Sequence, residues 1–217
     1  MSKIKNPLNT HLFNHELNYF LYSQSKNDKT MKYKIVLGSA SPRRQELLRQ
    51  LDWDFKTVSI KADEAYPNIL PATEVPEYLA IKKSLAYDKL KKDELLITAD
   101  TIVVLDGEIL EKPKNKTAAK KMLQALSGKK HEVITGVCLR TKRDILTFAD
   151  ISEVYFKKLK NKDINYYIDR YKPFDKAGAY GIQEWIGLVG IKKIKGSYYN
   201  IMGLPTAKLI DYIKECK

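Results

Sequence analysis

The segment 34–48 constrains the fold more than any other part of this sequence. Residues 35–37 form an apolar run of the kind that makes a buried strand, and small residues interrupt it at positions 38–41. A helix is predicted to follow, because Ser41 suits the N-cap and Pro42 suits the first helical position. A buried strand that passes directly into a helix indicates an α/β protein.

Two arginines, Arg43 and Arg44, fall in the first turn of this predicted helix. A cation there opposes the helix dipole and costs roughly 0.3–1 kcal/mol, so the pair calls for an explanation. Hydroxyl groups, free backbone N–H groups and guanidinium groups at one strand–helix junction are suited to binding a phosphate. The alternative is a surface helix whose arginines point into solvent, and the turn matches no P-loop pattern.

The chain has 217 residues, 44% of them apolar, which is enough for one good core or two small lobes. Its net charge of +13 fits a polyanionic substrate or a nucleic acid, but the lysines are scattered and no zinc-finger spacing or RNA-binding signature is present. No apolar stretch approaches the ~20 residues of a membrane span, and the N-terminus lacks the apolar core of a signal peptide. The two cysteines cannot form a disulfide framework, so we expect a cytoplasmic protein with no membrane partner.

We expect an appendage over residues 1–30, which show no periodicity, and one domain over residues 31–217. The apolar pattern predicts strands at 55–59, 95–99, 102–105, 108–110, 133–139 and 145–156, and helices at 74–91, 116–126, 163–171 and 206–215. Leu85 falls on the apolar side of the first of these helices. Parallel-type αβ units before a run of antiparallel strands indicate a mixed α/β domain with two lobes.

Asp100 is predicted to lie where one buried strand ends, with Thr101 beside it. Eleven residues on, the segment 111–113 closes a hairpin around Asp106-Gly107 and returns Lys112 to the neighbourhood of Asp100. A base and a cation on paired strands fit phosphate chemistry, in which positioning and charge neutralisation do most of the catalysis. The alternative is an aspartate that merely caps a turn.

The segment 172–187 has three glycines and follows neither helix nor strand periodicity, which is typical of a loop that lines a site. Its Gln183 carries a carboxamide that can read the edge of a base, although it can equally be solvated. A second loop of small residues is predicted at 196–205. His131 is the only histidine outside the appendage, and no nucleophile elbow or zinc-binding pattern occurs, so triad hydrolysis and a histidine metal site are not favoured.

Six motifs in order resemble the Maf family of nucleotide pyrophosphatases: SASPRRQELL, ADTIV, GEILEKP, LSGKKHEVITGV, DKAGAYGIQ and GSYYNIMGLP. The resemblance covers residues 33–213. It implies an inosine-triphosphatase-like fold, in which an elongated mixed sheet flanked by helices forms two lobes around a cleft. It also implies a homodimer that hydrolyses nucleoside triphosphates to the monophosphate and pyrophosphate with a divalent metal, Mg²⁺ or Mn²⁺.

Carried over by position, the resemblance makes Asp100 the proton acceptor that activates water. The residues that hold the substrate would be Ser39, Ser41, Arg43, Arg44, Lys83, Thr101, Lys112 and Gln183. Glu64 falls on an acidic position near the metal. Whether Asp100 binds the metal, accepts the proton or does both is left open by the residues themselves.

The form of the Gln183 motif resembles the family branch that acts on dTTP and UTP, whereas a branch acting on 7-methyl-GTP has glutamate at this place. Uracil and thymine offer an N3–H donor between two carbonyl acceptors, which a carboxamide can match. Glu184 follows where many members have glycine, and the appendage has no counterpart in the family. Two alternatives are a regulator of cell division, as the family's septum-formation name suggests, and a basic nucleic-acid-binding module.

Overall fold

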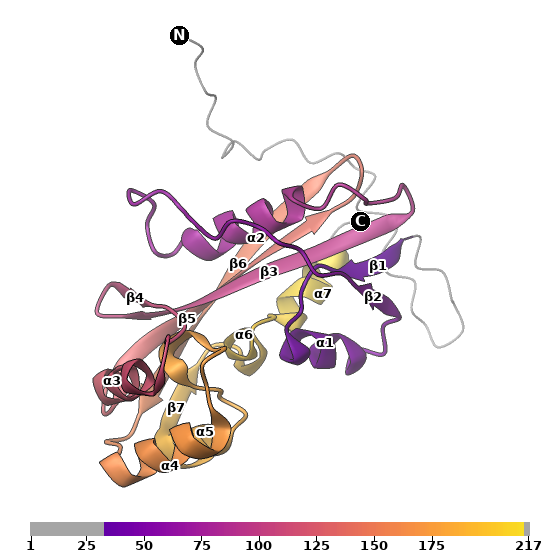
Figure 1. Ribbon diagram of the computed structural model, residues 1–217. Helices are drawn as coiled ribbons and strands as arrows, with labels where there is room; N and C mark the ends of the chain where they lie inside the picture. The colour runs from indigo at the N-terminus through magenta and orange to yellow at the C-terminus, as the bar shows by residue number, and fades with distance from the viewer. Residues whose placement is uncertain (1–32, 215–217) are drawn as a thin grey trace.

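One mixed sheet organises the computed structural model, which describes residues 33–214 (Figure 1). The strands follow the order β2-β1-β3-β5-β6-β7, and β4 pairs with β3. β1 is parallel to β2 and β3, whereas the other pairings are antiparallel. Their bounds are β1 Lys34–Leu37, β2 Phe55–Thr57, β3 Glu94–Leu105, β4 Glu108–Leu110, β5 Lys130–Arg140, β6 Ile145–Phe156 and β7 Ile191–Lys195. The expected mixed α/β fold is confirmed.

Helices lie on both sides of this sheet, with α2 on one side and α1, α6 and α7 on the other (Figure 1). α3, α4 and α5 gather near one end of the long strands. The helices are α1 Pro42–Arg49, α2 Val75–Leu85, α3 Lys116–Leu126, α4 Asn161–Tyr171, α5 Trp185–Gly190, α6 Tyr198–Met202 and α7 Thr206–Lys214, with a 3₁₀ turn at Ala177–Ala179. Within residues 33–214, no helix is both long and apolar enough to cross a membrane.

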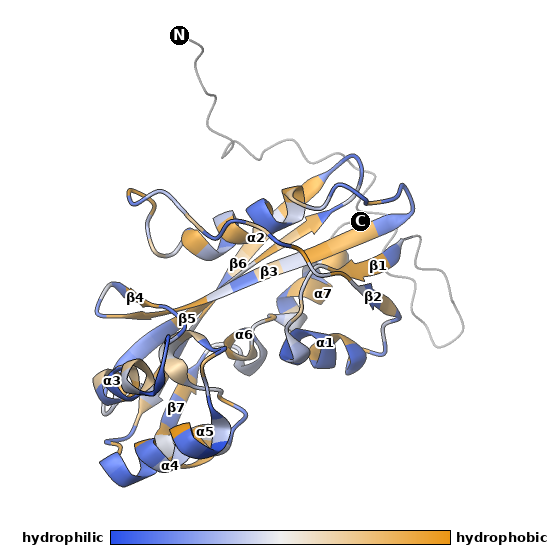
Figure 2. Ribbon diagram, in the orientation of Figure 1, coloured by the Kyte–Doolittle hydropathy of each residue, from blue (hydrophilic) through white to orange (hydrophobic). Residues whose placement is uncertain are grey.

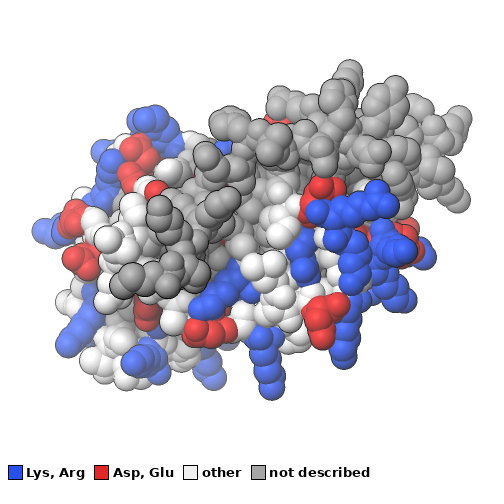
Figure 3. Space-filling model, turned by 90° about the horizontal axis from the view of Figure 1, so that it is seen from above, with Lys and Arg blue, Asp and Glu red and all other residues white. Residues whose placement is uncertain are grey.

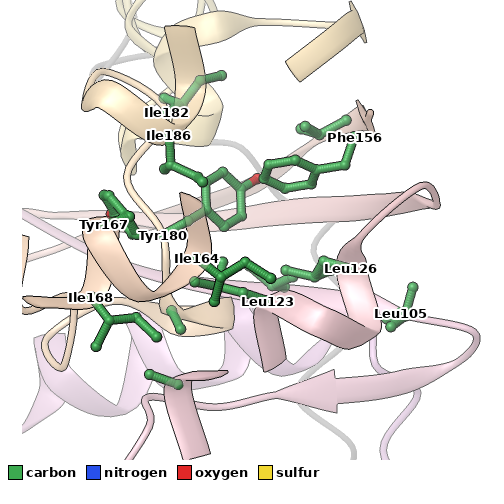
Figure 4. Packing of buried hydrophobic residues seen from close by; sticks show 14 of the residues in the cluster. Leu105, Leu123, Leu126, Phe156, Ile164, Tyr167, Ile168, Tyr180, Ile182 and Ile186 are labelled. Carbon is green, nitrogen blue, oxygen red and sulfur yellow. The ribbon is translucent and has the colours of Figure 1, made fainter. Parts of the chain in front are cut away.

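Two main hydrophobic cores divide the structure into the two lobes that the sequence predicts. In the first lobe, β1, α1 and α7 pack on the first half of β3 through residues such as Leu48, Ile97 and Leu209. In the second lobe, α3 and α4 pack on the second half of β3 around Leu123 and Tyr167 (Figure 4). Because β3 belongs to both cores, the middle of β3 is where the lobes meet.

The opposite face of the sheet is closed by α2, whose Val75 and Leu79 pack on Ile102 and Ile134. The backbones of α2 and β5 come very close at Gly136, where an added Cβ would lie 2.2 Å from the backbone nitrogen of Glu77. A glycine is therefore required there for α2 to rest on the sheet.

β3 corrects the prediction that Asp100 stands at a strand end. The strand runs without a break from residue 94 to 105, whereas the sequence predicts two strands, 95–99 and 102–105. Asp100 and Thr101 interrupt the apolar pattern, and Figure 2 shows this polar break in β3, but their backbones pair with Gly136 and Thr135 on β5. The ladder continues because backbone hydrogen bonds do not depend on side-chain polarity.

The helix expected over 74–91 ends at Leu85, and that side chain is 56% exposed rather than inward. Leu90, which continues the apolar pattern, packs separately against Val36 and Leu96. The elements α5, β7 and α6 were not predicted, because segments of five or six residues are too short to show a period. The hairpin signal is confirmed: φ is 52° at Asp106 and 88° at Gly107, as a type I′ turn requires.

Candidate functional site

A polar pocket lies where the two lobes meet, over the middle of β3. Arg43 and Arg44 of α1 line it from the first lobe, and Asp175, Lys176 and Gln183 line it from the second. A continuation of the pocket reaches the β1–α1 turn, including Ser39 and Ser41, and the loop that carries Glu64. All of the site residues predicted from the sequence line one or both parts of this pocket.

Lys83 joins the two predicted carboxylates. Its Nζ lies 2.5 Å from Oδ1 of Asp100 and 3.0 Å from Oε1 of Glu64. The Lys83 and Asp100 side chains are only 16% and 15% exposed, whereas Glu64 is 56% exposed. The Lys83 ammonium holds the pKa of Glu64 below its usual range. Asp100 is thus held in place by a lysine from the last turn of α2.

Arg44 is engaged by the protein itself. Its guanidinium donates to the carbonyl oxygens of Gly203 at 2.7 Å and Ala99 at 2.9 Å, and to Oγ1 of Thr101 at 3.0 Å. A longer bond of 3.4 Å reaches Oγ of Ser39, and burial lowers the pKa of the guanidinium. These contacts tie α1 to β3 and to the loop after α6, which explains a first-turn arginine without an anion.

Arg43 reaches across the pocket to the second lobe. Its NH1 lies 3.0 Å from Oδ2 of Asp175, whose other oxygen lies 2.7 Å from Nζ of Lys176. Burial opposes ionisation of Asp175, but the hydrogen bonds from Lys176 and Arg43 outweigh it and lower the pKa of the carboxyl group. Sequence reasoning missed both second-lobe residues, and the only signal for them was the Asp-Lys pair that precedes the glycine-rich segment.

The remaining predicted residues offer donors and acceptors around these charges. Ser39 is buried and its Oγ accepts from the backbone N–H of Ser41 at 3.2 Å. Ser41 occupies the N-cap of α1 but makes no side-chain capping bond, so its hydroxyl is available at the pocket. Lys112 and Gln183 are exposed and line the pocket from two different loops, one between β4 and α3 and the other before α5.

His131 lies behind the pocket wall rather than in it. It is 1% exposed, and its Nε2 is 2.7 Å from the hydroxyl of Tyr180, whose side chain lines the pocket. Burial lowers the pKa of His131 to about 4, so the ring is neutral at pH 7. A neutral buried ring braces Tyr180 and carries no catalytic charge, in agreement with the sequence analysis.

Two carboxylates of the pocket, Glu64 and Asp100, are candidate ligands for a divalent cation. Within residues 33–214 no group of three or more His, Cys, Asp and Glu side chains is arranged to hold a metal ion. Mg²⁺, however, is commonly bound by one or two carboxylates together with substrate phosphates. Glu64 and Asp100 are two such carboxylates on one lysine, so the residues fit a cation that arrives with a phosphate-bearing ligand.

The chain is similar to several known proteins. The sequence model of the family described as "Maf-like protein" matches residues 34–216. The "dTTP/UTP pyrophosphatase" of Phocaeicola vulgatus is 50% identical over 186 residues, which is 85% of this chain and 96% of that protein. The protein of the same name from Parabacteroides distasonis is 52% identical over 185 residues, covering 84% and 96% of the two chains. The structure of the Staphylococcus aureus Ham1 protein aligns at a TM-score of 0.43 and 16% identity, covering 57% of this chain and 71% of that one.

Proposed function

The chain belongs to the Maf-like protein family, and from this membership we propose that it is a nucleoside triphosphate pyrophosphatase that acts on dTTP and UTP. The reaction releases the nucleoside monophosphate and pyrophosphate. The observation that carries the proposal is the half-buried carboxylate of Asp100, which faces a pocket lined by Arg43, Lys83, Lys112 and Lys176. A carboxylate among cations is what hydrolysis of a polyphosphate needs.

The cations bind the triphosphate. Lys83 and Lys112 line both parts of the pocket, and Ser39 and Ser41 add hydroxyls at the β1–α1 turn. Arg43 is paired with Asp175 without substrate and would exchange that partner for a phosphate oxygen. Arg44 supports this wall by holding Thr101, which lines the pocket beside Asp100.

Asp100 accepts the proton from the water that attacks the α-phosphorus. Lys83 holds this carboxylate in place, and the negative phosphates of a bound substrate would draw the ammonium towards them. A divalent cation, Mg²⁺ or Mn²⁺, would be held by Glu64 and Asp100 with phosphate oxygens, and it would supply neutralisation of charge on those oxygens. Pyrophosphate leaves as the bond from the α-phosphorus to the bridging oxygen breaks.

Gln183 selects the base. Its amide group can donate to one carbonyl of uracil or thymine and accept from the N3–H, whereas a carboxylate only accepts. A pocket built around that match rejects a wrong edge by leaving buried polar groups unpaired. The exposed position of Gln183 in the pocket wall leaves its carboxamide open to a base.

Further proposals concern the location, assembly and partners of the protein. We propose a cytoplasmic homodimer, for which the exposed Leu188 and Val189 of α5 offer apolar surface. We do not propose a nucleic-acid partner, because Lys and Arg are interspersed with Asp and Glu on the face that Figure 3 shows. The appendage lies outside the described residues. A chain that starts at Met31 should keep full activity, since the family match begins at residue 34, and loss of turnover in that truncated protein would contradict this division.

The experiment is a panel of nucleoside triphosphates with Mg²⁺ or Mn²⁺, assayed for pyrophosphate against orthophosphate. UTP and dTTP should be turned over well above ATP, GTP and CTP, with pyrophosphate as the product. Gln183→Glu should lower kcat/KM for UTP by about 10–10²-fold, because the new carboxylate faces a carbonyl oxygen. Gln124→Glu on the exposed side of α3 adds the same charge away from the pocket and removes only a surface hydrogen bond to Asn161, so kcat/KM for UTP should stay unchanged. Orthophosphate as the first product, or a profile led by a purine, would refute the proposal.

A further inference from the structure

Glu184 lies directly behind the pocket wall, next to Gln183. Its carboxylate accepts from the hydroxyl of Tyr167 through Oε2 and lies 3.1 Å from Nζ of Lys176 through Oε1. The Glu184 and Lys176 side chains are 18% and 9% exposed, and Tyr167 is fully buried in the second core (Figure 4). Both oxygens of this carboxylate are therefore occupied, one by Tyr167 of the second core and the other by Lys176.

The same contacts close the short turn that carries Gln183. The hydroxyl of Tyr167 also accepts from the backbone N–H of Gly181 at 3.0 Å, and the backbone N–H of Glu184 donates to the Gly181 carbonyl oxygen at 3.0 Å. The Glu184 side chain folds back over this turn, since an added Cβ on Gly181 would lie 2.8 Å from its Cδ. Gln183 thus sits between two residues that are both bound to Tyr167.

The network continues into the pocket on the other side of Glu184. Lys176 lines the pocket and joins Glu184 to Asp175, which in turn holds Arg43 of the first lobe. One carboxylate therefore anchors the residue proposed to read the base and a cation of the pocket wall. A residue that only neutralised Lys176 would not also need the bond to Tyr167.

We propose that Glu184 is a positioning residue that sets the selectivity for pyrimidine bases, by fixing the turn that carries Gln183. This proposal rests on the proposed function and adds to it a residue that does not touch the substrate. A glutamine side chain matches a donor–acceptor edge only if its backbone is held, because freedom in the turn lets the carboxamide accommodate other edges.

The test compares Glu184→Gln with a matched control. Glu94 is also a buried carboxylate bound to a lysine, 2.6 Å from Nζ of Lys56, but it lines neither part of the pocket. Glu184→Gln should raise KM for UTP about 10-fold with kcat within about 3-fold, and should lower the UTP-to-CTP ratio of kcat/KM about 10-fold. Glu94→Gln should lower the unfolding temperature and leave that ratio unchanged.

Tyr167→Phe removes the hydroxyl that binds both Gly181 and Glu184, and it is the variant to use if Glu184→Gln does not fold. It should lower the same ratio, and in the double variant the two effects should not add, because both act through one turn. Amide hydrogen exchange at 181–183 should speed up in either variant, whatever the activity. An unchanged UTP-to-CTP ratio in both folded variants would overturn the role of Glu184 alone, whether or not exchange speeds up. A wild-type protein that releases no pyrophosphate from UTP would instead refute the proposed function itself.

Discussion

Asp100→Asn separates the chemical role of the site from its role in stability. The substitution keeps the shape of the side chain and removes the negative charge that lies 2.5 Å from Lys83. Removing one partner of a buried pair costs about 3–5 kcal/mol when it strands the other charge. Lys83 is not stranded, since Glu64 remains 3.0 Å from its Nζ, so we expect a loss of only about 1–2 kcal/mol of unfolding free energy.

The effect on turnover should be larger than the effect on stability. Loss of a general base lowers rates by roughly 10²–10⁴-fold, which corresponds to about 3–5 kcal/mol of activation free energy. Pyrophosphate release from UTP, measured beside urea unfolding, gives both quantities on the same preparation. Asp106→Asn is the matched control, because Asp106 pairs with Lys129 at 2.8 Å on the surface and an Asn-Gly turn keeps the type I′ geometry.

Comparing Asp100→Asn with Asp106→Asn tests whether Asp100 activates the water. Asp106→Asn should leave both turnover and stability close to wild type. Near-normal turnover of folded Asp100→Asn protein would show that another group activates the water. If Asp100→Asn is unfolded in the absence of substrate while Asp106→Asn is folded, then Asp100 is chiefly structural and Glu64 does not compensate for its loss.

Two further predictions concern buried polar groups. Arg44→Met should cost about 2–4 kcal/mol of unfolding free energy, because it leaves two carbonyl oxygens without their donor. The control Lys112→Met, at an exposed position, should cost less than about 0.5 kcal/mol. Equal urea midpoints for the two variants would contradict this prediction. His131 has a folded pKa of about 4, below its ordinary 6.5, so the unfolded chain binds the proton first as the pH falls. Stability from this group is therefore complete above pH 6.5 and is lost towards pH 4, roughly 2 kcal/mol of it between pH 7.5 and pH 5. His131→Gln should remove that part of the pH dependence, and an unchanged slope in urea unfolding would refute it.

The first strand–helix unit and the hairpin after β3 were predictable from the sequence. A strand, a small-residue turn and a helix opened by Pro42 are local matters of propensity and capping, and α1 begins where the sequence predicts. The Asp106-Gly107 hairpin is equally local. The expectation that Lys112 returns to the neighbourhood of Asp100 also agrees with the structure, because both residues line one pocket.

The continuity of β3 and the engagement of Arg44 could not be predicted in this way. A polar pair inside a strand ends the apolar pattern, while the backbone ladder with β5 carries on through Asp100. Arg44 finds its acceptors on Ala99 and Gly203, which lie 55 and 159 residues away along the chain. The contacts that tie Arg44 to β3 and to the loop after α6 are therefore visible only in the structure.

The sequence by itself determined which chemical groups are present and which local segments carry them, because strand, helix and turn preferences act over a few residues. Only the tertiary structure decided which charges meet. It brings Lys83 of α2 between Glu64 and Asp100, and it joins Arg43 to Asp175 across the two lobes. Side-chain contacts of this kind depend on how helices pack against one sheet, and that packing is set by the hydrophobic cores on either side of the pocket rather than by any nearby residue.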